Sequence, residues 1–433
     1  MLKRAKLYFF SISLLMSMAV SAQNLTDIYH QVLQSDPRLL VGSLQVEVSI
    51  AREQQAFGAL LPQVSLSSNW TQNEQLDGNS DKESFSGERH SLSVNQPLFD
   101  MPKYYAWKGR DVTHEQLFLQ QQETKSRVRL DTIKRYFSLL DAIDLLFLVR
   151  EERTLTKKKV EHIRALYKMQ RAKITDLYEA EARLDKLASS EIDAMQARDL
   201  AKESLNELTN LSVDDVSQLR GTSEYVQRIE NINNWSEQSV PGNYGLMALR
   251  KAIEAAQNYV DEESSGHLPQ LHMQLSKHKS NIGYEYAASP TTTTEVAGLN
   301  FILPLFSGGS TKARVYEAIK LLEISKAEYD MEKRKVIKKS RNSFLLVNAL
   351  VRRVKAATIS VESAQKAYQA MNRSFELGIS TVTQVLNAQT DFSAAKREHK
   401  KAKYMYITNK AELLQVSGKL NDDFIYEISK WLL

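Results

Sequence analysis

The chain repeats two short motifs at one fixed spacing. Leu61-Pro62-Gln63 recurs as Leu268-Pro269-Gln270, and Pro97-Leu98-Phe99 recurs as Pro304-Leu305-Phe306. Both pairs are 207 residues apart, and two coincidences at one offset indicate a duplication. We therefore expect two copies of one large unit, each running helix, strand, strand, very long helix, helix.

The duplication divides the chain into segments. Residues 1–22 are expected to be a secretory signal peptide, because a basic start and a short apolar run precede the small-residue site Val20-Ser21-Ala22. The first repeat is expected to span residues 23–211 and the second residues 241–433. Residues 212–240 are polar and are expected to be a linker with at most one or two helical turns.

Composition narrows the class of protein. The chain has no cysteine, which excludes disulfides, thiol chemistry and a lipidated N-terminal cysteine. The formal net charge of +5 falls to +2 without Lys3, Arg4 and Lys6, so nucleic acid is not an expected partner. The basic stretches 333–339 and 396–403 are interpreted as solvated helix faces. The eight histidines lack metal-ligand spacing and no catalytic motif stands out, so we predict no metal, no cofactor and no enzyme.

Long helices are favoured because the chain contains only 15 glycines and 8 prolines. Asp36 before Pro37 is a typical helix start, and Asn243 is its counterpart in the second copy. Residues 103–167 contain no proline, which predicts a helix of about 100 Å at 1.5 Å per residue. A turn near residue 170 and a second turn at residues 377–380 should each lead into a returning helix, over 175–210 and 381–420.

Strands of about ten residues are predicted after each Leu-Pro-Gln motif, where apolar and polar residues alternate. The apolar side comprises Val64, Leu66, Leu92, Val94, Leu271, Met273, Leu299 and Phe301. This pattern fits lipid-facing strands of a barrel and equally a small soluble sheet. Four strands cannot close, and open edges cannot lie in lipid. If the strands span a membrane, several chains must share one barrel.

The order of these motifs resembles that of the outer-membrane efflux protein family, the TolC-like channel tunnels. The similarity rests on the doubled unit, the two repeated tripeptides, Ser307-Gly308-Gly309 and the turns at 174–177 and 377–380. It implies a mainly α fold with a small β part: a long α-helical tunnel or coiled-coil barrel on a 12-stranded transmembrane β-barrel shared by a homotrimer. It implies a bacterial outer-membrane location, with the helical body in the periplasm.

The resemblance also implies a function and partners. The channel would be the passive exit duct of a tripartite system, joined to a periplasmic adaptor protein and an inner-membrane transporter, and would export drugs or small toxic compounds. One alternative is a channel for type I protein secretion. Another is a soluble periplasmic coiled-coil scaffold or adaptor, which would not need detergent for extraction.

The same resemblance assigns site residues. The periplasmic gate would involve Asp176, Ser380, Gln384 and Asn387. Adaptor docking would involve Gln170, Arg171, Gly378 and Ile379. Similar efflux tunnels carry acidic residues where Gln384 and Asn387 stand, so the amides put a cation-selecting acidic ring in doubt. The alternative reading is that these are ordinary exposed helix and loop residues.

Overall fold

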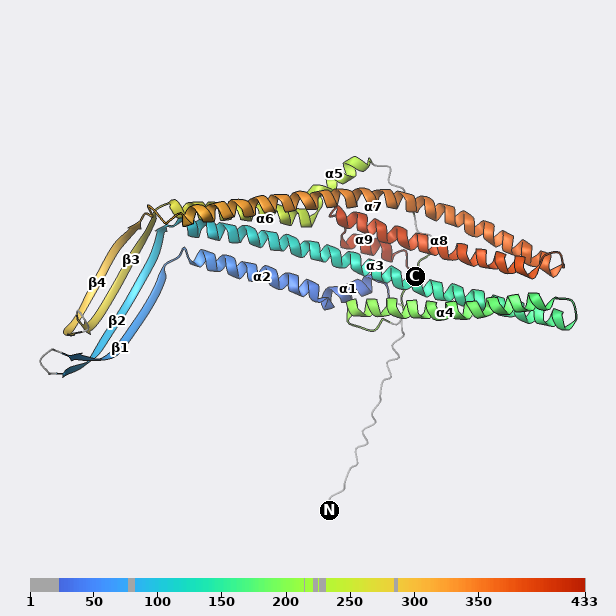
Figure 1. Ribbon diagram of the computed structural model, residues 1–433, viewed down its shortest axis with the longest axis horizontal. Helices are drawn as coiled ribbons and strands as arrows, with labels where there is room; N and C mark the ends of the chain where they lie inside the picture. Colours follow the sequence, from blue (N-terminus) through green and yellow to red (C-terminus); the bar gives the residue numbers. More distant parts are fainter. Residues whose placement is uncertain are drawn as a thin grey trace, which may run out of the picture.

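The computed structural model describes residues 23–76, 82–213, 215–220, 225, 231–283 and 287–432. The expected signal peptide, residues 1–22, lies outside the described residues. The described chain is elongated, with a sheet at one end and two helical turns at the other (Figure 1). No helix in this part of the protein combines the length and the apolar character needed to cross a membrane.

The first half of the chain follows the predicted element order. Its helices are α1 (Leu25–Ser35), α2 (Pro37–Gly58), α3 (Met101–Lys168) and α4 (Ile174–Thr209). The Asp36 carboxylate accepts a hydrogen bond from the Arg38 amide at 2.9 Å, and Pro37 occupies the first helical turn. The predicted helix start at Asp36 and Pro37 is therefore confirmed, because both the side-chain cap and the fixed proline φ favour it.

The second half repeats this order with additions. Its helices are α5 (Ile232–Gly242), α6 (Tyr244–Ser264), the short 3₁₀ helix η1 (Ser265–His267), α7 (Ser310–Glu376), α8 (Val382–Val416) and α9 (Asp422–Ser429). Asn243 caps α6 as predicted, through the Leu246 amide at 3.0 Å. The prediction that the last long helix extends to Leu420 is wrong, because Gly418 has a φ of +68° and ends it. Helix α9 was not expected, and α5 is longer than the one or two turns predicted there.

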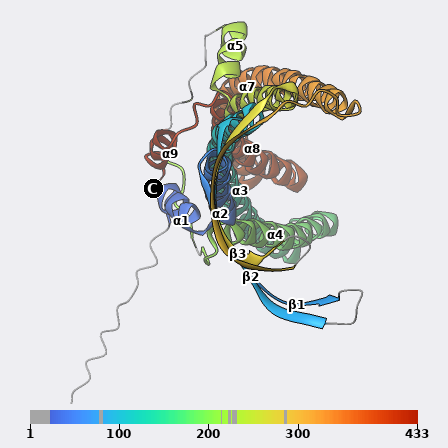
Figure 2. The same cartoon turned by 90° about the vertical axis from the view of Figure 1, so that its left-hand side faces the viewer.

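One antiparallel sheet collects all four strands in the order β1 (Gln63–Leu76), β2 (Lys82–Phe99), β3 (Gln270–Ile282) and β4 (Ala288–Ile302). The strands have 14, 18, 13 and 15 residues, so the predicted length of about ten residues was too short. The β2–β3 pair joins the two repeats, and β1 and β4 are the edges. The sheet is curved (Figure 2).

The helices form a curved wall that continues the sheet. Helix α3 packs against α2 and α6 near the sheet, and against α4 and α8 towards the turns. Helices α1 and α9 lie on the convex side of this wall (Figure 2). The main apolar core lies beneath them and includes the fully buried Tyr29, Tyr136 and Ile425. Among the residues that the structure describes, no helix or strand covers the concave side of the wall (Figure 2).

Candidate functional site

The sheet has one apolar face. Val64 lies opposite Val94, and Val94 lies opposite Leu275 on the next strand. Met273 and Leu299 form a pair further along the same face. Because directly paired residues of neighbouring strands share a face, all eight residues of the predicted apolar stripe lie together. Those with exposed side chains are Val64, Leu66, Leu92, Leu299 and Phe301, while Val94, Leu271 and Met273 are half-buried.

The opposite face of the sheet is polar. Ser65 and Ser93, which form a cross-strand pair there, are joined by a 2.7 Å hydrogen bond between their hydroxyl groups. The apolar face is interrupted by Gln96, which lies opposite Met273, and towards the strand tips, where Lys277 Nζ lies 2.6 Å from Glu295 Oε1. The two faces thus suit two different surroundings, one apolar and one aqueous.

The two helical turns have the same backbone geometry. Gln170 and Gly378, which are 208 residues apart, both adopt positive φ, at 59° and 77°. In the first turn the Arg171 amide donates to the Leu166 carbonyl at 2.8 Å, and the equivalent bond in the second turn is 2.9 Å. This is the six-residue hydrogen bond of a Schellman motif. The lack of a glycine in the first turn therefore does not change its form, because Gln170 takes the left-handed conformation itself.

All four residues predicted for docking are exposed at these turns. Gln170 and Arg171 lie at the tip between α3 and α4, and Gly378 and Ile379 at the tip between α7 and α8. Ile379 leaves 76% of its surface exposed, which is unusual for an isoleucine. No side chain or backbone atom approaches within 4 Å of the position that a Cβ would take at Gly378. The second tip is thus an open, apolar surface.

The predicted gate residues have local roles as well. The Asp176 carboxylate accepts from the Lys173 amide at 3.4 Å, and Gln384 Oε1 accepts from the Thr381 amide at 2.9 Å, so both stabilise helix starts. Asn387 lies one turn beyond Gln384 on the same exposed side of α8. Ser380, at the start of α8, lies with its Oγ 3.8 Å from the sulfur of a methionine on α7.

Helices α3, α4 and α8 are joined by polar contacts that the sequence did not single out. Thr383 Oγ1 donates to Glu179 at 2.7 Å near the two turns, and Gln389 Nε2 donates to Thr156 Oγ1 at 2.8 Å further along. Beyond them, the Asp144 carboxylate binds side chains of α8. Asp144 stands out in the sequence because it lies between apolar residues of α3. The sequence could not indicate its partners, which lie more than 250 residues further along the chain.

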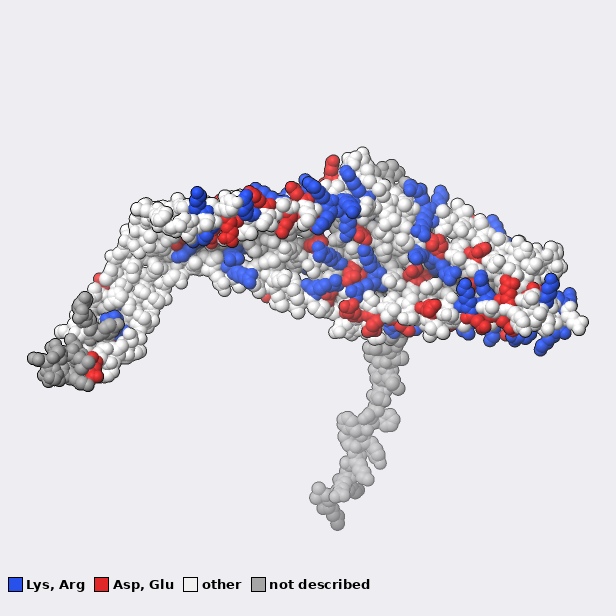
Figure 3. Space-filling model, viewed as in Figure 1, with Lys and Arg blue, Asp and Glu red and all other residues white. Residues whose placement is uncertain are grey.

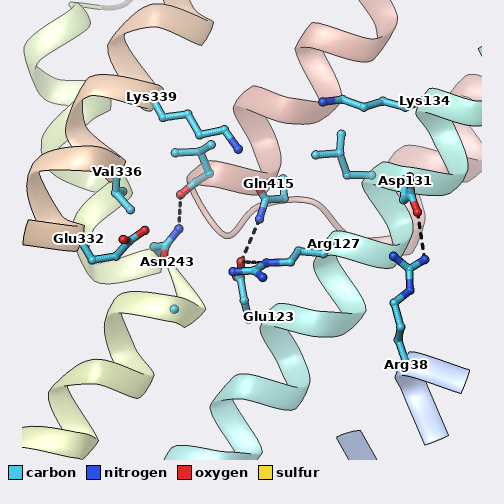
Figure 4. Close-up of a pocket in the computed structure, with 13 residues that line it drawn as sticks. Arg38, Glu123, Arg127, Asp131, Lys134, Asn243, Glu332, Val336, Lys339 and Gln415 are labelled. Carbon is cyan, nitrogen blue, oxygen red and sulfur yellow. Dashed lines mark hydrogen bonds and ion pairs between the residues drawn. The ribbon is translucent and has the colours of Figure 1, made fainter. Parts of the chain in front are cut away.

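A hollow of about 430 Å³ opens where α3, α6, α7 and α8 meet (Figure 4). Its charged groups largely pair with one another. Arg127 Nε lies 2.8 Å from Glu123, which also accepts from Gln415 Nε2 at 3.2 Å. Arg38 Nη2 contacts Asp131 at 3.0 Å. Nothing here resembles a nucleophile with its base, and the hollow is part of a polar, charged wall.

A curved wall of long paired helices, continued by a sheet with one apolar and one polar face, defines a subunit of a membrane-spanning duct. The protein belongs to the outer membrane efflux protein family, whose model matches residues 28–211 and 235–419. It is an outer-membrane exit duct for export, and its family is one of channels. The soluble periplasmic scaffold considered above has no support in this family.

Relatives agree with this assignment. The chain is 26% identical to outer membrane protein TolC of Salmonella enteritidis, over 95% of this chain and 85% of that protein. It is 28% identical to the alkaline protease secretion protein AprF of Pseudomonas aeruginosa, over 93% and 85%. The fold matches that of the Campylobacter jejuni CmeC outer membrane channel, with a TM-score of 0.83 and 15% identity, over 96% of this chain and 91% of that one.

Proposed function

We propose that three copies of this chain form the outer-membrane channel of a tripartite export system. An inner-membrane transporter would supply the energy, and a periplasmic adaptor would join it to the channel. The cargo would be drugs and small toxic compounds. The observation that carries this proposal is the continuity between the two-faced sheet and a helical wall whose concave side is not covered by any other described element (Figure 2).

The edges of the chain support assembly with further copies. Strands β1 and β4 each have one edge without a partner in the described sheet, and such edges must be paired in lipid. Along α2, Leu40, Leu44 and Val48 recur every four residues and are all exposed. On α7, at the other edge of the wall, Ile324 and Met331 are also exposed. Apolar strips at both edges suit a closed ring, in which one edge of each copy meets the other edge of the next.

The turns are the proposed contact with the adaptor. Gly378 and Ile379 would offer an apolar tip, and Gln170 and Arg171 a more basic one. Asp176, Ser380, Gln384 and Asn387 would narrow the periplasmic mouth of the tube by packing and hydrogen bonding between copies. The eight apolar sheet residues would face lipid. The division into two repeats at 23–211 and 241–433, joined by 212–240, is part of the same proposal.

Type I protein secretion is the second candidate function. The observation in its favour is the 28% identity to a protein named for alkaline protease secretion. The two cargo classes are separable by deleting the gene and measuring two things in parallel: susceptibility to a panel of small toxic compounds, and the proteins present in the culture medium. Sensitivity with an unchanged set of secreted proteins supports the first function, and the reverse result supports the second.

Assembly is tested on the detergent-extracted protein. Chemical cross-linking and native mass measurement should both give three chains. A stable monomer that keeps its strand content by circular dichroism would contradict the shared barrel. Extraction from the outer-membrane fraction without detergent would contradict the lipid-facing role of the sheet.

A further inference from the structure

The concave face of the helical wall can be identified from contacts to the opposite face. On α3, Arg129 Nε lies 2.6 Å from Asp422 of α9, and Tyr136 donates to the Ser217 carbonyl at 2.9 Å. Both partners belong to the layer on the convex side. Lys134 is two residues from Tyr136, and two residues rotate a helical side chain by about 200°. Lys134 therefore points to the concave side.

The same reasoning applies to α8. Lys410 lies 3.1 Å from Glu427 of α9, so it faces the convex side. Glu412, two residues further on, faces the concave side. On α7, Ser340 contacts Ser239 of α5 at 2.9 Å, whereas Lys338 is two residues away and exposed. One side chain from each of three helices thus reaches the concave face at the same level.

Positive charge exceeds negative charge at this level. Glu412 is shared by two lysines, with its carboxylate 2.8 Å from Lys134 Nζ and 3.3 Å from Lys339 Nζ. Burial alone would raise the pKa of Glu412, but hydrogen bonds and attraction from these lysines keep its pKa below the ordinary value. The carboxylate is therefore ionised and neutralises only one of its two partners.

Further lysines line the hollows on either side of Glu412. A hollow of about 560 Å³ includes Lys335 and Lys338, and a neighbouring one of about 280 Å³ includes Lys401. Lys335 is paired with Glu332 at 3.3 Å, while no ion pair is described for the exposed Lys338. Lys and Arg side chains gather midway along this face (Figure 3).

The hollow that Lys401 shares with Glu412 also contains the carboxylate of Asp141. A second hollow beside Lys401 contains Asp144 and Glu398, which are paired with Lys400 and Arg353. Burial raises the pKa of Asp141, although attraction to Lys401 acts in the opposite direction. At the turns, Gln384 and Asn387 contribute neutral amides where a ring of carboxylates would attract cations. In the two hollows beside Glu412, the three carboxylates of Glu332, Asp141 and Glu412 face five lysines, so a positive excess remains.

We propose that Lys134, Lys335, Lys338, Lys339 and Lys401, here called the lysine belt, make the duct selective for anions. In a trimer, three belts would form one positive ring around the lumen, and a ring of charged side chains selects ions of opposite sign. The favoured cargo is a small organic anion, such as a carboxylate, sulfate or phosphate ester. This inference rests on the proposed trimeric duct, because only there do the concave faces surround one lumen.

The test measures ion selectivity of the purified full-length trimer in planar lipid bilayers. With a potassium chloride gradient across the bilayer, the reversal potential gives the permeability ratio of chloride to potassium. We expect a ratio above one in the wild type. Lys338→Glu should lower this ratio by at least about twofold, because the field of the ring reverses locally. Lys430→Glu makes the same charge change on the exposed end of α9, on the convex side, and should leave the ratio unchanged.

The outcomes separate this inference from the proposed function. A conducting channel that prefers potassium, or equal ratios in Lys338→Glu and Lys430→Glu, overturns the lysine belt while the exit duct stands. A trimer that inserts but carries no current at all contradicts the duct itself. Native mass measurement of each variant before insertion ensures that a lost trimer is recognised as an assembly defect, in which case Lys338→Gln replaces Lys338→Glu.

Discussion

Lys400 Nζ on α8 lies 2.5 Å from the Asp144 carboxylate on α3. The same carboxylate accepts a 2.5 Å hydrogen bond from the Tyr404 hydroxyl, and burial raises the pKa of Tyr404, so this phenol stays protonated and donates. Asp144 is only 7% exposed at its side chain. The contact joins the long helix of one repeat to the returning helix of the other. It therefore fixes the position of α8 along α3.

Asp144→Ala should therefore destabilise the protein. It leaves Lys400 and Tyr404 without their acceptor, at a cost of about 1–3 kcal/mol, less than for a fully buried pair because the Lys400 side chain is 38% exposed. Thermal unfolding of the detergent-solubilised protein should show a lower midpoint. Glu398→Ala, which breaks the exposed pair with Arg353, is the control and should change little. Equal effects of both variants would contradict the role of Asp144.

Phe301→Arg should impair insertion. Phe301 is exposed on the apolar face of β4, and an arginine facing lipid costs about 2–4 kcal/mol at the middle of the bilayer. The amount of assembled trimer in the outer-membrane fraction is the measurement. Asn300→Arg places the same residue one position away, on the polar face of the same strand, and should be far milder. If both variants lose trimer equally, the apolar face does not meet lipid.

Much of the fold follows from local sequence signals. Asp36 with Pro37, Asn243, and the prolines of the Leu-Pro-Gln motifs set helix and strand boundaries through interactions within a few residues. The alternation of apolar residues predicted the shared face of the sheet, because strand geometry has a period of two. Strand lengths were underestimated, since the polar ends of β2 and β4 lack that alternation and are held only by pairing across the sheet.

Other features depend on contacts between distant segments. Helix α9 has only eight residues, and it is held by α1 and by Arg129 through Asp422. Four members of the lysine belt lie in the stretches 333–339 and 396–403, which were interpreted as solvated helix faces, and Lys134 was not singled out. The spacing of Lys335, Lys338 and Lys339 does place them along one side of a helix, but only the packing of α5 and α9 reveals that this side is the concave one.

Gly378→Val should reduce export while leaving the trimer intact. The φ of +77° at Gly378 is unfavourable for any β-branched residue, at roughly 1–3 kcal/mol, and no neighbouring atom would block the side chain. The expected defect is thus a displaced tip that docks poorly, measured as increased susceptibility to exported compounds. Gly378→Asn, which tolerates this conformation better, should export more nearly as the wild type does. Normal export in Gly378→Val would remove the docking assignment.

Gln170→Gly should stabilise the first turn. Gln170 adopts a left-handed conformation that glycine adopts without strain. The free energy of unfolding should rise by about 0.5–1 kcal/mol, after the greater conformational freedom of glycine in the unfolded chain is subtracted. Hydrogen exchange of the Arg171 amide, which is bonded across the turn, should slow accordingly. Met169→Gly, at a φ of −85°, should accelerate exchange instead. Faster exchange in Gln170→Gly would mean that its side chain makes a stabilising contact in the assembled channel.

Acidic substitutions at the proposed gate should change selectivity without enlarging the opening. Glutamate at position 384 can still accept from the Thr381 amide, so the helix start is retained in the double variant Gln384→Glu, Asn387→Asp. Three such pairs would form a negative ring and shift the permeability ratio of the reconstituted trimer towards potassium. By contrast, Gln384→Ala with Asn387→Ala removes the amides and the cap, and should raise conductance with less effect on selectivity. If neither double variant differs from the wild type in bilayer recordings, Gln384 and Asn387 do not line the narrowest part of the duct. Gln384 is then only a helix-capping residue, and Asn387 only an exposed surface residue.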